Sequence, residues 1–344
     1  MKKTTRFVSL FLAAAMLFVL SACTGKNESW AVEVDGEQIP TGIYLYYQFN
    51  AYQEAASLAE DAETDLFKQK IEDQDATVWI HQKTIELCRR RVAAEREFAR
   101  LELTMDEGNQ QYIDSIVDYI MSYYKDVYEQ NGIGIESVTK AVTTDQMTTA
   151  LFYKYYGEDG LEMVTDAQMM EYYTGNYAAA YMFGTSVAGY EEADAQTARD
   201  AAATAAESIK AGKGVAETAA VMTKAINPDA EIDEEADDSH YMVAIGKDDE
   251  SYPQAFRDAV FAAAVDTPIV YDQDDYLLVY VRKDAASETE TFEGLKDTIL
   301  QSLKGDEFEE KLDTIANALT VTENTSAVRY YSAKKIKDLK DLAE

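Results

Sequence analysis

Apolar side chains recur every three to four positions through most of the first half of the chain, which is the spacing of an amphipathic helix. This pattern predicts a nearly all-helical segment between residue 41 and about residue 177. Ahead of it, residues 30–40 alternate apolar and polar positions around Asp35-Gly36, which predicts a small β-hairpin. The helices are expected at residues 42–60, 77–103, 106–131, 135–157 and 165–176.

Short strands alternate with helices between residues 178 and 285. The expected order is β-α-α-β-α-β-β, which indicates a compact α+β domain. The strands are expected at residues 178–187, 240–246, 268–272 and 276–281, and the helices at residues 193–211, 215–224 and 251–263.

Helical spacing returns at residues 286–319. The stretches VTEN and AVRYY after it predict a short terminal strand, which a lysine-rich amphipathic end follows. The fold class expected is therefore α+β, with a mainly helical domain made of N- and C-terminal segments and an inserted α+β domain. The predicted boundaries are residues 30–177 and 286–344 for the helical domain and 178–285 for the inserted domain.

The N-terminus has the features of a secretory signal peptide, expected to cover residues 1–22. The apolar run from Phe7 to Leu20 has 14 residues, fewer than the roughly 20 that cross a bilayer. The tetrad LSAC that ends at Cys23 resembles a bacterial lipobox, which implies a lipid on Cys23 and cleavage before it. An ordinary signal peptide that contains a cysteine is the alternative. Residues 23–29 would form a polar tether.

The charge balance excludes several classes of protein. Asp and Glu number 64 against 31 Lys and Arg, a net charge of −33. This excess argues against a nucleic-acid partner, since binding phosphates requires clustered positive charge. It also argues against adsorption to an anionic membrane, so attachment is expected through the lipid on Cys23. The 47% apolar content excludes a disordered acidic chain.

The sequence predicts no metal site and no cofactor. Two His and two Cys do not suffice for a Cys/His zinc site, and neither GxGxxG nor GxxxxGK[ST] occurs. Cys88, the thiol that remains after Cys23, is expected to be buried, and Arg89–Arg91 to form a helix face paired with Glu86 and Glu95. The acidic runs at residues 229–238 and 272–275 lack the spacing of an EF-hand, so they are interpreted as solvated loops, although Ca²⁺ binding stays open.

Four segments of the chain resemble the SurA/PrsA group of extracytoplasmic foldases. In that family a helical chaperone domain, built from both ends of the chain, flanks a parvulin-type peptidyl-prolyl isomerase domain. The resemblance implies unfolded or partly folded secreted proteins as partners, on the outer side of a bacterial membrane, and leaves a homodimer open. The segments are VEVDGEQIPTGIYLYY (32–47), NGIGIESVTKAVTTDQMTTALF (131–152), MVTDAQMMEYYTGNYAAAYMF (163–183) and YPQAFRDAVFAAAVDTPIVYDQDDYLLVYV (252–281).

The sequence departs from the parvulin pattern at the positions that carry histidine in that family. The first strand has Tyr181-Met182-Phe183 and the last strand has Asp275-Tyr276-Leu277. The Gly-rich stretch before the middle strand is replaced by Glu234–Asp238, and the two histidines, His81 and His240, lie elsewhere. Weak or absent isomerase activity is therefore expected, because Leu and Met form none of the hydrogen bonds of His.

The parvulin resemblance leaves an apolar groove as the candidate site, and no residue is assigned a catalytic role. Tyr252, Phe256 and Phe261 would form its floor, with Tyr271 and Tyr276 on the same groove. Packing in the domain core is the alternative for Phe256, Phe261 and Tyr252.

Three functions remain open on the sequence. The expected one is a chaperone whose Tyr- and Met-rich helical half holds unfolded segments. An active prolyl isomerase with unusual groove chemistry is the second. The third is a solute-binding lipoprotein of a transporter, which requires two α/β lobes around a cleft.

Overall fold

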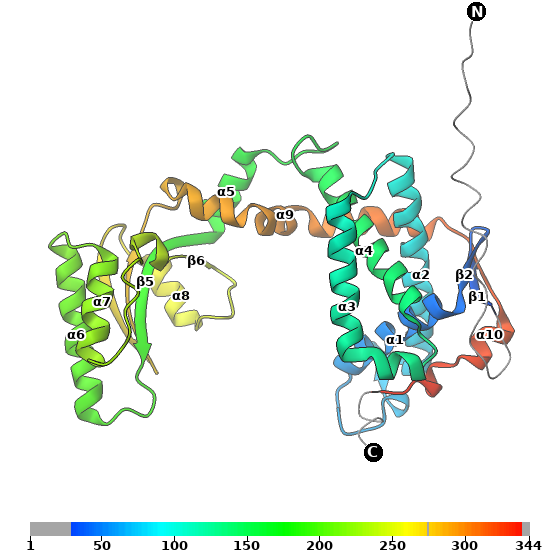
Figure 1. Cartoon of the computed structure of the whole chain (residues 1–344), viewed down its shortest axis with the longest axis horizontal. Coiled ribbons are helices and arrows are strands. Elements are labelled where there is room, and N and C mark those ends of the chain that lie inside the picture. Colours follow the sequence, from blue (N-terminus) through cyan, green and yellow to red (C-terminus); the bar gives the residue numbers. More distant parts are fainter. Residues whose placement is uncertain (1–28, 274, 339–344) are drawn as a thin grey trace, which may run out of the picture. The chain divides into compact units, whose positions relative to one another are not determined.

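A computed structural model of the chain describes residues 29–273 and 275–338 (Figure 1). The predicted signal peptide, the lipid position Cys23 and most of the tether lie outside these residues. The contacts divide the chain into two compact units. Met1–Tyr155 with Glu307–Glu344 is called the helical unit, and Tyr156–Asp306 the sheet unit. Helices and small antiparallel sheets together confirm the α+β class, whereas the domain boundaries at residues 178 and 286 stay a prediction.

The helical unit begins with the predicted hairpin. Asp35 and Gly36 have φ values of 49° and 86°, so both adopt the left-handed backbone of a tight two-residue hairpin turn. A strand from the C-terminal segment pairs with the free edge of the first strand, which gives the order β2-β1-β9. The strands are β1 (Trp30–Val34), β2 (Glu37–Pro40) and β9 (Val321–Glu323).

Four long helices form most of the helical unit, and side chains fix where two of them begin. Asp75 accepts a hydrogen bond from the Thr77 backbone N–H (2.9 Å), and Asp106 forms a capping box with Asn109. Several tyrosines, among them Tyr44, Tyr46, Tyr47 and Tyr128, are buried in the core between the helices. The elements are α1 (Thr41–Leu58), η1 (Leu66–Lys68), β3 (Lys70–Ile71), β4 (Gln74–Asp75), α2 (Ala76–Arg100), α3 (Glu107–Gln130), α4 (Ile135–Tyr156), α10 (Thr325–Tyr330) and η4 (Ala333–Lys335).

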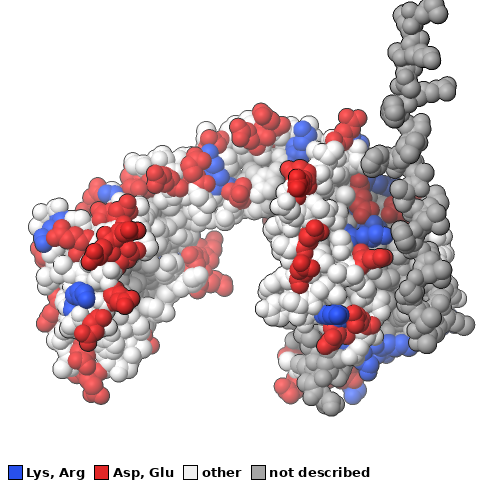
Figure 2. Space-filling model, viewed as in Figure 1, with Lys and Arg blue, Asp and Glu red and all other residues white. Residues whose placement is uncertain are grey.

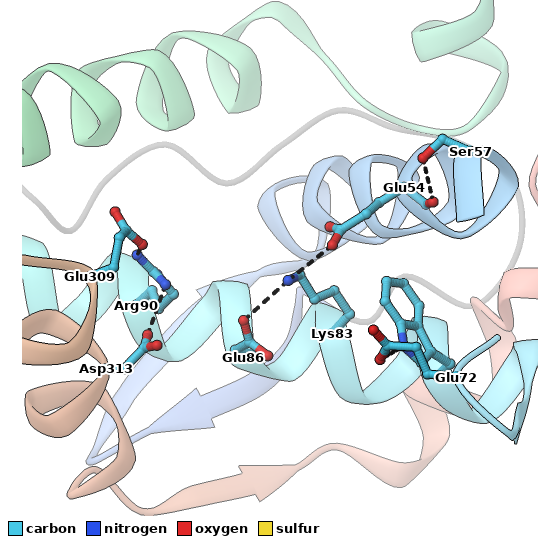
Figure 3. A network of polar contacts seen from close by, with 9 residues as sticks. Glu54, Ser57, Glu72, Lys83, Glu86, Arg90, Glu309 and Asp313 are labelled. Carbon is cyan, nitrogen blue, oxygen red and sulfur yellow. Dashed lines mark hydrogen bonds and ion pairs between the residues drawn. The ribbon is translucent and has the colours of Figure 1, made fainter. Parts of the chain in front are cut away.

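Ion pairs on α2 tie the C-terminal segment to the N-terminal helices of this unit. Arg90 pairs with Glu309 and with Asp313 (2.8 Å), both from the long helix Thr289–Asn317 (Figure 3). The expected pairing of the arginine run is confirmed for Arg91 with Glu95, 2.8 Å apart.

Glu86, expected to pair with the arginine run, pairs instead with Lys83 at 3.3 Å. Lys83 also forms an ion pair with Glu54 at 3.1 Å (Figure 3). Cys88 is fully buried, as expected, and burial raises the pKa of its thiol to about 12.

The sheet unit is built on one antiparallel sheet in the order β6-β5-β8-β7. Its last helix, α9, begins in this unit and ends in the helical unit. The elements are α5 (Asp166–Asn176), β5 (Tyr177–Ser186), α6 (Glu192–Lys210), α7 (Val215–Ile226), η2 (Asp238–Tyr241), β6 (Met242–Gly246), α8 (Gln254–Ala262), β7 (Pro268–Gln273), β8 (Tyr276–Arg282), η3 (Ala285–Ser287) and α9 (Thr289–Asn317).

The two faces of this sheet carry two separate apolar clusters. Along β8, Leu277 and Val279 point to the face covered by α6 and α7, whereas Leu278 and Tyr280 point to the face covered by α8. This alternation decides which residues of the sheet unit can share a site.

Two expectations for secondary structure are wrong. The stretch AVRYY, expected in a strand, lies mainly in α10, because Asn324 caps a helix there by accepting from the Ala327 backbone N–H (3.4 Å). The strand expected from residue 240 begins at Met242, since His240 and Tyr241 lie in the 3₁₀ turn η2. Within the described residues, no helix is both long and apolar enough to span a bilayer.

Candidate functional site

Phe256, the centre of the predicted groove, is enclosed by three tyrosine rings. It lies on α8, and only 1% of it is exposed. Its ring centroid lies 5.5 Å from that of Tyr252, 4.9 Å from that of Tyr271 and 5.6 Å from that of Tyr280. Three predicted groove residues are therefore brought together, but around a packed core rather than an open surface.

The other two predicted residues lie differently. Phe261 is half-buried against the same cluster, with the Lys247 ammonium 5.6 Å from its ring centroid. Tyr276 starts β8, is 46% exposed and does not belong to the cluster. Tyr280 was missed by the sequence analysis, although period-two alternation along β8 places it on the α8 face with Leu278. The groove itself stays a prediction.

The positions that match the parvulin histidines hold no equivalent polar network. Leu277 is fully buried in the apolar cluster beneath α6, with Val279 beside it. Tyr181 is half-buried, and the Lys283 ammonium lies 5.7 Å from its ring centroid. His81 lies in the helical unit, 3.2 Å from a carboxylate oxygen of Glu323.

A cavity of about 520 Å³ opens in the sheet unit on the side of α7. That volume lies within the roughly 300–1,000 Å³ of ordinary ligand pockets. Its wall combines four segments that are separate in the sequence, including Phe183 and Thr185 of β5, Met222 and Ile226 of α7, and His240 and Tyr241 of η2.

Aromatic contacts shape one wall of this cavity. The Tyr241 ring packs edge-on against Phe183 (6.0 Å between centroids) and against His240 (5.4 Å). Gly184 also lines the cavity, and a Cβ there would lie only 2.2 Å from the Leu277 carbonyl oxygen. Glycine therefore lets β5 and β8 approach closely at this point. No Asp, Glu, Lys or Arg is among the described lining residues, so the cavity suits an uncharged, partly apolar group.

The loop between α7 and η2, which contributes Ala230 to the cavity wall, is rich in acids. Seven of the ten residues at 229–238 are Asp or Glu. Three of them stabilise local structure: Asp238 accepts from the Ala216 backbone N–H (2.8 Å), Asp233 from that of Glu235 (3.0 Å) and Asp237 from that of Ser239 (3.0 Å). Within the described ranges, no group of His, Cys, Asp and Glu side chains is arranged to hold a metal ion.

A second candidate surface lies on α3 of the helical unit. Its inward face is buried through Ile113, Val117 and Val127. Its outward face carries Tyr112, Tyr119 and Tyr123, which are 52%, 62% and 67% exposed, with Ile116 half-buried between them. The rings of Tyr119 and Tyr123 lie 4.9 Å apart. These four residues are called the α3 stripe, and Figure 2 shows uncharged surface over this helix between small groups of acids.

Comparison with known proteins gave solved structures but no sequence relatives. No family model matches the chain, and no curated protein matches it. Among similar structures is the foldase protein PrsA from Lactococcus lactis, with 15% identity and a TM-score of 0.39, where the match covers 90% of this chain and 100% of that chain. The foldase protein PrsA from Streptococcus pneumoniae has 14% identity and a TM-score of 0.35, with 76% of this chain and 87% of that chain covered. PrsA from Bacillus subtilis has 12% identity and a TM-score of 0.31, with 80% of this chain and 91% of that chain covered.

All three structures are PrsA proteins, the family that the sequence motifs resemble. Their TM-scores are too low for the likeness to carry an argument about function. The residues that this chain places together must carry it instead.

Those residues offer surface for binding. Within the described residues, no hydrogen bond joins His240 to a hydroxyl group of the cavity lining. What the two units offer is apolar and aromatic surface: a packed aromatic core under α8, a cavity beside α7 and an exposed stripe on α3.

Proposed function

We propose that this protein is a membrane-anchored extracytoplasmic chaperone that assists the folding of secreted proteins, with a sheet unit that is weak or inactive as a prolyl isomerase. The α3 stripe is the observation that carries the proposal. It places three tyrosines, each more than half exposed, along one helix face.

Such a stripe suits the transient holding of unfolded chains. Contiguous exposed apolar surface on a soluble protein is typical of interaction sites. Tyrosine offers an apolar ring face with a polar tip, so it binds varied side chains and remains compatible with water. The surrounding acids keep the chain itself soluble through net charge.

The remaining parts of the proposal rest on the sequence. The lipobox-like tetrad supports anchoring through Cys23, and the four foldase-like segments support secreted clients. Replacement of the family's histidines supports low isomerase activity, and the enclosed ring of Phe256 agrees with that. The transporter-receptor alternative requires two α/β lobes, but the described part of the chain has one helical unit and one unit with a four-stranded sheet.

Suppression of aggregation tests this proposal. The soluble form that begins at Thr24 is mixed with a chemically unfolded secreted protein, and light scattering is followed during refolding. Suppression is expected from the unaltered chain, and a severalfold weaker effect from a variant with Tyr112→Ser, Tyr119→Ser and Tyr123→Ser.

The matched control changes three exposed apolar residues of the same unit outside the stripe, Leu58→Ser, Val78→Ser and Ile135→Ser. It is expected to retain the activity. Equal loss in both variants would show that the stripe has no special role, and no suppression by the unaltered chain would refute the chaperone proposal.

A further inference from the structure

The cavity beside α7 and the acidic loop next to it together indicate what kind of polypeptide segment the sheet unit binds. The cavity is lined by uncharged residues, and its aromatic wall is made by Phe183 and Tyr241. Met222 and Ile226 extend this wall, so an apolar side chain is favoured there because burying it against them excludes water from both surfaces.

The acidic loop adds a charge requirement. Ala230, which lines the cavity, lies within the loop, and His240, another lining residue, follows it closely. Residues 225–246 contain no Lys or Arg, so the charge of the loop is not balanced within this segment. Lys224, just before this segment, donates a hydrogen bond to the Pro228 carbonyl oxygen (3.1 Å), and within the described residues it forms no ion pair with an acid of the loop.

Three acids of this loop are exposed and stabilise nothing in the fold. Glu231, Glu234 and Glu235 lie on the surface, and in the part of the chain that the structure describes their carboxylates form no ion pair or hydrogen bond. Glu234 and Glu235 are adjacent, and Glu231 lies three positions before Glu234, so the loop concentrates negative charge in a short segment. Salt screens the field of such charges over roughly 8–10 Å.

We infer that the cavity beside α7 binds an apolar side chain of an unfolded polypeptide whose neighbouring residues are Lys or Arg, which the acidic loop attracts. This inference rests on the proposed chaperone function and names its preferred client segments. Segments rich in positive charge approach this unit fastest and leave it slowest, whereas acidic segments are repelled.

Peptide binding tests the inference with the whole soluble chain. Two labelled peptides share a central Leu-Phe core, one with lysines at both ends and the other with glutamates. Fluorescence anisotropy is expected to show about tenfold tighter binding of the lysine peptide at low salt, because several weak, screened charge pairs act together. The difference should shrink as salt is added.

Two pairs of variants separate the charge from the cavity. A loop variant that combines Glu231→Gln, Glu234→Gln and Glu235→Gln is expected to abolish the preference for the lysine peptide. Its control makes the same charge change at exposed positions elsewhere in the unit, with Glu158→Gln, Glu171→Gln and Glu290→Gln, and is expected to keep the preference. Thr223→Trp, at the edge of the cavity, should weaken the lysine peptide about tenfold by filling the space.

Thr197→Trp makes the same change on α6 at an exposed position outside the cavity lining and should leave binding unaltered. Equal affinity for the two peptides, or a preference that survives the loop variant, would overturn the inference. If aggregation suppression persists while the peptide preference is absent, the inference fails alone. If both are absent, the chaperone proposal fails with it.

Discussion

Buried carboxylates of the helical unit show how single residues are held in this strongly acidic chain. Glu97 on α2 has only 8% of its side chain exposed. Its carboxylate accepts from Arg100 Nε (2.7 Å) and Nη2 (2.6 Å) and from the Tyr155 hydroxyl. The hydrogen bonds from Arg100, chiefly, lower the pKa of Glu97 below its usual range.

Because this pKa is lowered on folding, ionised Glu97 stabilises the folded state above the unfolded-state pKa of about 4.3, and this stability is lost as pH falls through the folded-state pKa. Glu97→Gln is therefore expected to reduce the free energy of unfolding by about 1.5–3 kcal/mol at pH 7, and by less near pH 3. Trp30 and Trp79 both lie in the helical unit, so tryptophan fluorescence in urea reports on it. Exposed Glu129→Gln is the control, and an equal loss at both pH values would contradict the argument.

At the scale of elements, capping side chains set the ends of helices more sharply than hydrophobic spacing does. Asp106 accepts from the Asn109 backbone N–H (2.8 Å), and the Asn109 side chain accepts from the Asp106 backbone N–H (3.1 Å). Asp106→Ala is expected to destabilise the helical unit by about 1 kcal/mol, measured by the same fluorescence in urea. Asp106→Ser keeps a capping oxygen and should cost clearly less, so equal losses would show that the cap contributes little.

Hydrophobic spacing predicted most helices and strands, because burial of one face dominates their stability. It failed at AVRYY, where alternation suggested a strand but the Asn324 cap starts a helix. For the site, the motif around Phe256 identified an aromatic cluster, and strand alternation in β8 added Tyr280. The cavity beside α7 was not predictable, since Phe183 and Tyr241 meet only through the pairing of strands far apart in the sequence.

At the scale of the whole molecule, the chain combines an acidic surface with a proposed client-binding site in each unit. A net charge of −33 keeps an anionic membrane surface from binding it directly, so the proposed lipid on Cys23 would supply attachment without competing with clients. If both proposed sites bind one client, the chain that joins the two units raises the effective concentration of the second site once the first is occupied.

At this scale, holding an unfolded client and catalysing its prolyl isomerisation are two activities that can be tested separately. Rotation about a prolyl bond crosses a barrier of about 18–20 kcal/mol, and a catalyst must bind the twisted amide better than the planar one. Leu277 is buried where the foldase family has a histidine, and Phe256 is enclosed. The soluble form that begins at Thr24 is therefore expected to leave prolyl isomerisation at its uncatalysed time of tens of seconds. The rate is measured on peptides with varied residues before proline. A clear rate above background, lost in the surface variant Tyr276→Ala, would instead establish an active groove and make isomerisation part of the function.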